Sequence, residues 1–362
     1  GWVYCVRLSD GALVWRFLAA LEQINSVAFE QVESLWPIHG SVLVQDGIAY
    51  VAAGRSSYLD GGIRLYGLDP RTGEVVCDAQ VTSQHSGVHE PPPEETRAAM
   101  ETQNRQNFTD YKTFLAPDRS DAFAMRGAVT GILTGDGESV FMRHLRFDQE
   151  LSPLRTAKPH LFSTASLLDD SHHHRSYWVL GTGDFHRLPV AYPWIVTKSM
   201  AVPYGLMMTF DDRTVWTVQR SGKKRARADH ALVAMQRPDP ADPANRAGDF
   251  EERSGQRAAR NLWSAALPFR PRAILHAGDL LLVGGMPERT PQADATATDT
   301  DATLLVGGGV LTAFSADRGE VLGETRLVAP PAWDAMAAVQ GRLYLALDDG
   351  SVICLEDAEV AE

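Results

Sequence analysis

The sequence predicts an all-β fold, a β-propeller built from four-stranded antiparallel blades, and three observations support it. A glycine-led apolar run recurs along the chain, and in two copies a second glycine follows ten residues later. A short segment rich in Asp, Pro, Thr or Gly separates two alternating strands, as in a β-hairpin. A further glycine-led strand precedes several copies, so each unit has four short strands. The clearest hairpin copies cover residues 1–15, 62–76, 309–322 and 350–357.

The remaining strands follow the same pattern with weaker signals. Glycine-led strands are expected at 40–44 and 47–52 before the second hairpin copy, and at 278–283 and 341–346 before the last two. The middle of the chain is degenerate. There the apolar runs predict strands at 131–133, 139–142, 176–180, 205–210 and 214–218. We expect about five or six blades in this segment, as part of a ring of about seven or eight.

The blades predict one propeller domain over residues 1–357, followed by a tail over 358–362. The chain begins inside a strand pattern without an initiator Met or a signal peptide. We therefore expect the domain to be partial at its N-terminus and to pack against upstream blades of the same chain. Three polar insertions are expected within the domain, at about 82–122, 221–261 and 286–302.

Composition narrows the classes of function. The net charge of −12 argues against a nucleic-acid partner, because such binding depends on neutralising phosphates. The sequence has no run of about 18 apolar residues, which is the length that a transmembrane helix needs. Three cysteines without a CxxC pair do not form a disulfide framework. Two of them, Cys5 and Cys354, occupy the same repeat position, so both are expected to be buried on equivalent strands.

The hairpin copies resemble the repeat of the pyrroloquinoline-quinone (PQQ) type of propeller. Gly1 to Trp15 matches that repeat through its final Trp, and Leu68 to Gly73 matches its turn. The family includes quinoprotein dehydrogenases and the envelope lipoprotein that helps to assemble outer-membrane proteins. The resemblance implies a periplasmic, cell-envelope or secreted bacterial protein. It also implies either a binding scaffold or a quinoprotein-like oxidoreductase.

For the dehydrogenases the resemblance would imply PQQ with Ca²⁺ on the propeller axis, and commonly a disulfide between adjacent cysteines. No two cysteines are adjacent in this sequence. The docking Trp of the repeat is present at Trp15, whereas the matching places hold Cys77 and Gly323. We therefore expect no cofactor, with neither PQQ nor calcium bound.

One loop between two predicted strands, residues 54–62, carries candidate ligand-binding side chains. It combines a cation, hydroxyls, an aromatic ring and a carboxylate between glycines. The alternative is a hydrated loop in which Arg55 and Asp60 pair with each other. By blade order this loop, the insertion after Val81 and the insertion after Gly285 should open at the same end of the propeller. The candidates in the loop are Arg55, Ser56, Tyr58 and Asp60.

Two further places carry candidate side chains. Trp36 could fill the gap between blades and His39 could line the central channel, or both could bind a ligand. His172 and His174 would point to one face of an extended segment, a spacing suited to a metal ion such as Zn²⁺. No third ligand is fixed by the local sequence, so the alternative is a pair of solvated histidines at the start of a strand.

The function we favour is a noncatalytic scaffold that binds a protein, a polysaccharide or a small ligand on its loop-rich face. The alternative is an enzyme, either a quinoprotein-like oxidoreductase or a hydrolase whose polar residues converge only in space. The sequence has no Gly-x-Ser-x-Gly elbow, no Walker loop and no GxGxxG fingerprint. A heme-binding or vicinal cysteine motif elsewhere in the protein would favour the oxidoreductase.

Overall fold

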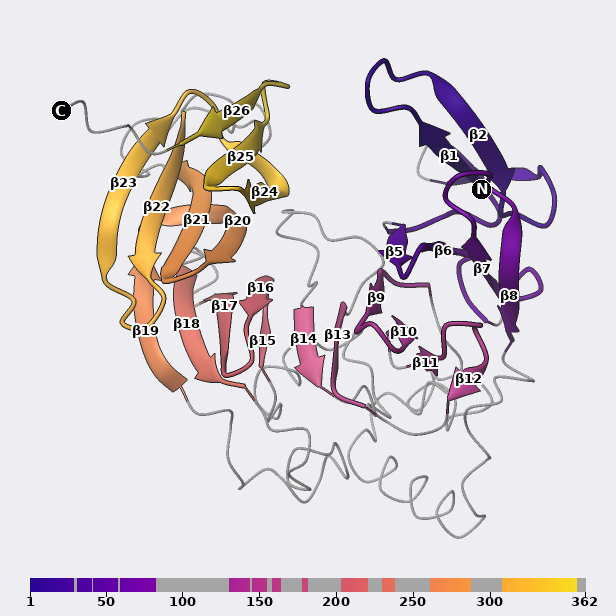
Figure 1. Ribbon diagram of the computed structural model, residues 1–362, viewed down its shortest axis with the longest axis horizontal. Helices are drawn as coiled ribbons and strands as arrows, with labels where there is room; N and C mark the ends of the chain where they lie inside the picture. Colours follow the sequence, from indigo (N-terminus) through magenta and orange to yellow (C-terminus); the bar gives the residue numbers. More distant parts are fainter. Residues whose placement is uncertain are drawn as a thin grey trace, which may run out of the picture. The chain divides into compact units, whose positions relative to one another are not determined.

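Every regular element in the described part of the chain is a β-strand (Figure 1). The computed structural model describes residues 1–28, 31–40, 42–57, 59–82, 130–143, 145–154, 158–163, 178–181, 203–220, 230–237, 261–287 and 308–356. Contacts divide the chain into two compact units, which we describe separately. The first unit contains β1 to β13 and most of β14, and the second contains β15 to β26.

The first unit consists of antiparallel sheets that follow one another along the chain. A two-stranded sheet, β1 (Trp2–Val6) and β2 (Leu13–Leu18), is followed by the hairpin β3 (Asn25–Ala28) and β4 (Gln31–Ser34). The first four-stranded sheet is β5 (Leu43–Gln45), β6 (Ile48–Ala53), β7 (Ile63–Leu68) and β8 (Val75–Val81). The next is β9 (Leu133–Gly135), β10 (Val140–Met142), β11 (Leu145–Phe147) and β12 (Pro153–Leu154), after which β13 (His160–Ser163) pairs with β14 (Trp178–Gly181).

The second unit repeats this organisation after the short strand β15 (Tyr204–Gly205). Its first complete sheet is β16 (Met207–Phe210), β17 (Thr214–Arg220), β18 (His230–Gln236) and β19 (Asn261–Leu267). The second is β20 (Phe269–Ala277), β21 (Leu280–Pro287), β22 (Gly309–Ser315) and β23 (Val321–Leu327). The last sheet is β24 (Pro331–Val339), β25 (Arg342–Leu347) and β26 (Val352–Leu355).

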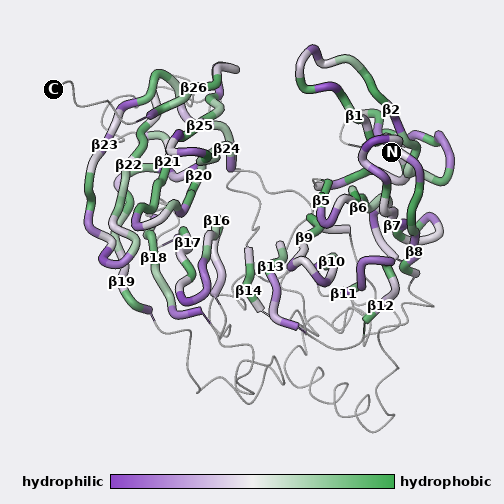
Figure 2. The backbone as a smooth tube through the Cα atoms, in the orientation of Figure 1, coloured by the Kyte–Doolittle hydropathy of each residue, from purple (hydrophilic) through white to green (hydrophobic). Residues whose placement is uncertain are grey.

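The sheets confirm the predicted fold class, since four antiparallel strands joined in chain order form one propeller blade. Neighbouring sheets pack face to face through apolar side chains. Tyr50 and Phe147 belong to the cluster between β5–β8 and β9–β12, and Trp216 and Phe314 belong to the one between β16–β19 and β20–β23. Figure 2 shows the hydrophobic colour along central strands such as β21 and β22. Burial of these strand faces is the main force that holds the blades together.

Two expectations require correction. The range 221–261 is not one polar insertion, because β18 lies inside it as an inner strand of its sheet. The sequence pattern did not indicate β18, because its apolar run is short and lies between two charged segments. Cys354 is not buried: it lies in β26 but is exposed, while Cys5 in β1 is half-buried. The side chains of Ile353 and Leu355 pack on the core, so strand alternation directs Cys354 to the opposite face.

Candidate functional site

The predicted loop 54–62 is a tight turn held by its own backbone. The Gly62 amide donates to the Leu59 carbonyl at 2.8 Å, and the Leu59 amide donates to that of Ser56 at 3.2 Å. Asp60 adopts a φ of 52° and is exposed. Tyr58, His172 and His174 lie outside the described residues.

The Arg55 side chain bonds to the β3–β4 hairpin and forms no ion pair with Asp60. Its guanidinium donates to Ser26 Oγ at 2.9 Å and lies 3.2 Å from a carboxylate oxygen of Glu33. A weaker hydrogen bond reaches the Ser34 carbonyl at 3.5 Å. The alternative that Arg55 pairs with Asp60 is therefore wrong, and the side chain instead ties the loop to the hairpin.

Trp36 and His39 lie near the contact between the loop and the β3–β4 hairpin. Trp36 is buried among Val3, Ala19 and Ala53, and its Nε1 donates to the Asp60 carbonyl at 2.8 Å. It therefore packs between the β1–β2 and β5–β8 sheets. His39 is half-buried, and burial lowers the pKa of its imidazole, with the Arg55 charge acting in the same direction and Glu33 opposing both.

The loop connections share one end of the β5–β8 sheet. Ala53 pairs with Arg64, and Ile63 pairs with Val81, so β6 and β8 both finish where β7 begins. Within the first unit, the loop after β6 and the connection after β8 therefore open at the same end, as predicted. The connection after Gly285 belongs to the second unit, so its place relative to these two stays a prediction.

A chain of hydrogen bonds extends from this loop to the next blade. The Thr130 amide donates to the Arg55 carbonyl at 3.2 Å, and the Thr130 hydroxyl donates to the Gly54 carbonyl. Arg143 in turn donates to the Thr130 carbonyl at 3.3 Å. Arg143 is buried, and burial lowers its pKa to about 10. The sequence analysis missed Arg143, although a cation between the apolar β10 and β11 was a signal that could have found it.

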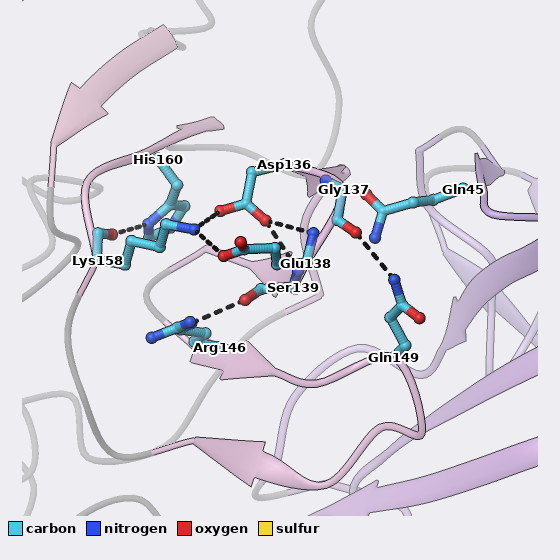
Figure 3. Close-up of polar contacts among 9 residues, drawn as sticks. All are labelled: Gln45, Asp136, Gly137, Glu138, Ser139, Arg146, Gln149, Lys158 and His160. Atoms are coloured by element: carbon cyan, nitrogen blue, oxygen red, sulfur yellow. Dashed lines mark hydrogen bonds and ion pairs between the residues drawn. The ribbon is translucent and has the colours of Figure 1, made fainter.

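His160 closes this chain at the start of β13 (Figure 3). Its Nε2 lies 2.5 Å from the Arg143 carbonyl oxygen and its Nδ1 lies 2.8 Å from that of Lys158. The ring stacks on Phe141 at 4.0 Å. Burial lowers the pKa of His160 and outweighs the two carbonyls, which favour the protonated ring. The neutral ring carries one N–H and can donate to only one of them.

An ion-pair cluster lies beside His160 at the turn between β9 and β10 (Figure 3). Lys158 Nζ lies 2.7 Å from Asp136 Oδ2 and 2.9 Å from Glu138 Oε2. These bonds raise the pKa of Lys158. Partial burial would raise the pKa of Asp136, but hydrogen bonds from Lys158 and from the Glu138 and Ser139 amides lower it overall.

Two glutamines join this turn to the neighbouring β5–β6 turn. The Gly137 amide donates to Gln45 Oε1 at 2.9 Å, and Gln149 Nε2 donates to the Gly137 carbonyl at 2.9 Å. Gln149 also donates to Asp46 Oδ2 at 2.7 Å. The ionisable side chains of this part of the first unit thus hold loops and turns in place.

The second unit contains a tryptophan contact that the sequence analysis missed. Trp15 Nε1 donates to the Pro70 carbonyl at 3.0 Å, and Trp263 Nε1 donates to that of Ala316 at the same distance. The expectation that the docking Trp is present only at Trp15 is therefore wrong. Trp263 lies in β19, where the preceding charged segment obscured its strand.

The described ranges contain neither a metal-ligand cluster nor a membrane-spanning helix. None of their His, Cys, Asp and Glu side chains gather in groups of three or more that could hold a metal ion. No helix in those ranges has the length and apolarity needed to cross a bilayer.

No protein-family model and no curated protein matches this chain. Solved structures similar to it include BamB from Moraxella catarrhalis, at 11% identity and a TM-score of 0.42, covering 100% of this chain and 78% of BamB. A quinohemoprotein alcohol dehydrogenase from Comamonas testosteroni is similar at 12% identity and a TM-score of 0.43, covering 96% of this chain and 60% of the dehydrogenase. The chain thus spans less than two thirds of that enzyme. Both TM-scores lie below 0.5, so the propeller fold of this chain rests on its own sheet topology and not on these structures.

Proposed function

We propose that this chain is a noncatalytic propeller scaffold that binds a protein at the loop end of its first unit. The observation that carries the proposal is an exposed apolar pair on the β3–β4 hairpin. Val27 and Val32 face each other across the two strands and are 75% and 71% exposed. Exposed apolar side chains gathered at one place are typical of protein-binding surfaces.

The hairpin is anchored, which favours binding. Arg55 reaches it from the neighbouring loop and bonds to Ser26 and Glu33, and the Leu35 amide closes its base on the Ile24 carbonyl at 3.0 Å. A surface held in one conformation loses less entropy when a partner binds. In this proposal Arg55 is a positioning residue, and the exposed Asp60 of the same loop is a candidate acceptor for the partner.

The chemistry of this surface favours a protein over a polysaccharide or a small ligand. Sugars bind well to exposed aromatic faces that carry polar neighbours, whereas a valine pair offers only apolar contact. The net charge of −12 disfavours a nucleic acid. A location in the periplasm, the cell envelope or outside the cell is proposed from the resemblance of the repeats.

An oxidoreductase or a hydrolase is the second candidate. Such an enzyme would need ionisable groups that are available to a substrate. In the first unit Arg55, Lys158 and His160 are engaged by neighbouring side chains and carbonyls, which supports the scaffold over the enzyme.

Site-specific photo-crosslinking in the source cells tests the proposal. The crosslinking residue p-benzoylphenylalanine would replace Val27 or Val32, with Val321 in β23, 63% exposed, as the control position. We expect one discrete protein adduct from the hairpin positions and none from the control. Arg55→Ala should lower the adduct yield, whereas Arg342→Ala, which removes an exposed ion pair with Glu356 in the second unit, should not. The same adducts from Val321, or none from the hairpin, would contradict the proposal.

A further inference from the structure

The neutral ring of His160 has one proton too few for its two contacts. Nε2 lies 2.5 Å from the Arg143 carbonyl oxygen and Nδ1 lies 2.8 Å from that of Lys158, and each contact needs an N–H on the ring nitrogen. The imidazolium would satisfy both carbonyls. The ring is only 5% exposed and stacks on Phe141, however, so a charge is costly at this place. The proton and the buried position of the ring therefore oppose each other.

The charged side chains around His160 leave burial as the dominant influence. Asp136 in the β9–β10 turn favours the imidazolium, and Arg146 in β11 opposes it. The Asp136 carboxylate is already bonded to Lys158, which also pairs with Glu138 (Figure 3). The strands that contact β13, namely β9, β10 and β14, carry no charged residue. The pKa of His160 is accordingly lowered, because burial outweighs the gain from a second hydrogen bond.

The carbonyl that Nε2 contacts belongs to a strained turn. Arg143 is buried between β10 and β11 with a φ of 53°, a left-handed conformation that a residue with a side chain keeps only when its neighbours hold it. A Cβ built on Gly131 would lie 2.8 Å from Arg143 Cγ, so this side chain packs closely on the backbone before β9. Its guanidinium donates to the Thr130 carbonyl at 3.3 Å. Loss of the bond from His160 would remove one of the contacts that hold this turn.

Thr130 connects the turn to the loop that anchors the β3–β4 hairpin. Its amide donates to the Arg55 carbonyl at 3.2 Å, and its hydroxyl donates to the Gly54 carbonyl. The Gly54 amide donates to the Pro37 carbonyl at 3.0 Å. The Arg55 guanidinium lies 3.2 Å from the Glu33 carboxylate of the hairpin. Thr130 thus fixes the backbone of Arg55, and the side chain of Arg55 fixes the hairpin.

We propose that His160 is a proton-operated latch: the neutral ring holds the Arg143 turn, and the protonated ring leaves its buried place for water, which loosens the anchor of the β3–β4 hairpin. This regulation rests on the proposed function, because the hairpin is the surface that we assign to the partner. The latch has two states, ring in and ring out, and a proton favours the second, where the imidazole is exposed. Partner binding would then weaken as the medium becomes acidic.

Linkage sets the size of the effect. An exposed imidazole titrates near its ordinary pKa of about 6.5, whereas the buried ring titrates lower. Between about pH 7.5 and pH 5.5 the ratio of ring-out to ring-in molecules therefore rises by at most about tenfold. A histidine whose burial did not affect its pKa would give no change in this ratio.

Hydrogen exchange of the whole chain, followed by mass spectrometry at these two pH values, tests the latch without a partner. We compare protection factors, which remove the intrinsic pH dependence of exchange. On going to the lower pH they should fall by up to about tenfold at the Thr130 amide and at the Leu35 amide, which closes the base of the hairpin. The Gly73 amide, which donates to the Asp69 carbonyl in the β7–β8 turn, is the internal control and should keep its protection.

Two variants assign the response to a residue. His160→Gln keeps an N–H for the Arg143 carbonyl but does not titrate in this range, so Thr130 and Leu35 should stay protected at both pH values. His39→Gln removes the other half-buried histidine near the hairpin and should respond to pH as the wild type does. The wild type and His39→Gln separate the two histidines even if His160→Gln does not fold.

Several outcomes would overturn the latch. These are unchanged protection of Thr130 or Leu35 in the wild type, a response that persists in His160→Gln, and a response that His39→Gln abolishes. An equal fall at Gly73 would also overturn it, because it would show general unfolding. The absence of a crosslinked partner at Val27 and Val32 would contradict the proposed function instead, since exchange measures the latch with no partner present.

Discussion

His160 shows how one buried side chain responds to two opposing influences. Two backbone carbonyls lie within hydrogen-bonding distance of its ring nitrogens and favour the imidazolium. Burial beside Phe141 opposes the charge and prevails, so the pKa lies below its usual value. The half-buried His39 is shifted in the same direction, again mainly by burial.

These shifts predict that the protein loses stability as the pH falls. A histidine whose pKa is depressed in the folded state stabilises the fold fully above its unfolded pKa of about 6.5, and loses that contribution as the pH falls through the folded value. Thermal melts between about pH 8 and pH 5 should therefore show a falling Tm. His160→Phe, which keeps the stacking and cannot titrate, should flatten the profile, with His39→Phe as the comparison. An unchanged slope in both variants would contradict the assignment.

At the scale of the element, one contact recurs between neighbouring blades. Side chains of one blade donate hydrogen bonds to a backbone carbonyl in a turn of the next blade. Pro70 accepts from Trp15 and Cys5, Gln149 from Tyr50 and Cys77, and Ala316 from Trp216 and Trp263. The two donors of each pair stand in the same cross-strand register of their sheet, so both reach the same carbonyl of the next blade. Where Cys77 replaces the repeat's Trp, Tyr50 supplies the strong donor instead, and burial raises its pKa to about 12.

This contact predicts the effect of Tyr50→Phe. The change removes the 2.8 Å hydrogen bond to the Gln149 carbonyl and keeps the ring in the core. We expect a loss of about 1 kcal/mol in the free energy of unfolding, measured by urea denaturation. Tyr4→Phe is the matched control, because that hydroxyl is on an exposed side chain, and it should change the stability little. Equal effects would show that the hydroxyl of Tyr50 contributes no bond.

Three hairpin turns, residues 7–12, 69–74 and 315–320, share the same backbone hydrogen bonds, and the indoles of Trp15 and Trp263 cover Gly73 and Gly319 of the second and third. These turns predict a graded effect of adding one methyl group. Gly11→Ala, Gly73→Ala and Gly319→Ala all place alanine at a positive φ, which costs about 1 kcal/mol. At Gly73 and Gly319 the new Cβ would also displace a docked indole, so these variants should lose at least about 1 kcal/mol more than Gly11→Ala. Identical unfolding midpoints for the three variants would contradict the docking geometry.

Much of the fold was predictable because local chemistry repeats in the chain. The turn from Asp69 to Gly73 and the alternating strands on either side of it predicted a blade, and the structure contains that blade as the sheet β5–β8. The contacts between blades were not predictable to the same degree. Trp263 meets a carbonyl 53 residues away, and Arg55 turns to Glu33 on a hairpin that no repeat position indicates. Such contacts depend on how sheets pack, which a periodic pattern leaves open.

At the scale of the whole molecule, the structure consists of blades whose polar side chains mostly support other parts of the protein. Lys158 holds Asp136 and Glu138, and Arg55 holds the β3–β4 hairpin. The surface that we propose for recognition is apolar, the Val27–Val32 pair of that hairpin.

The last prediction concerns the quinoprotein alternative. A PQQ site must compensate the carboxylates of the cofactor with cations, and Arg55 and Lys158 already pair with Glu33, Asp136 and Glu138. The sequence also lacks the adjacent cysteines that the resemblance would imply. We therefore expect the protein supplied with PQQ and Ca²⁺ to show no dye-linked oxidation of alcohols or sugars, measured beside a quinoprotein dehydrogenase as positive control. Turnover above the protein-free background, abolished when calcium is chelated, would replace the scaffold with an oxidoreductase.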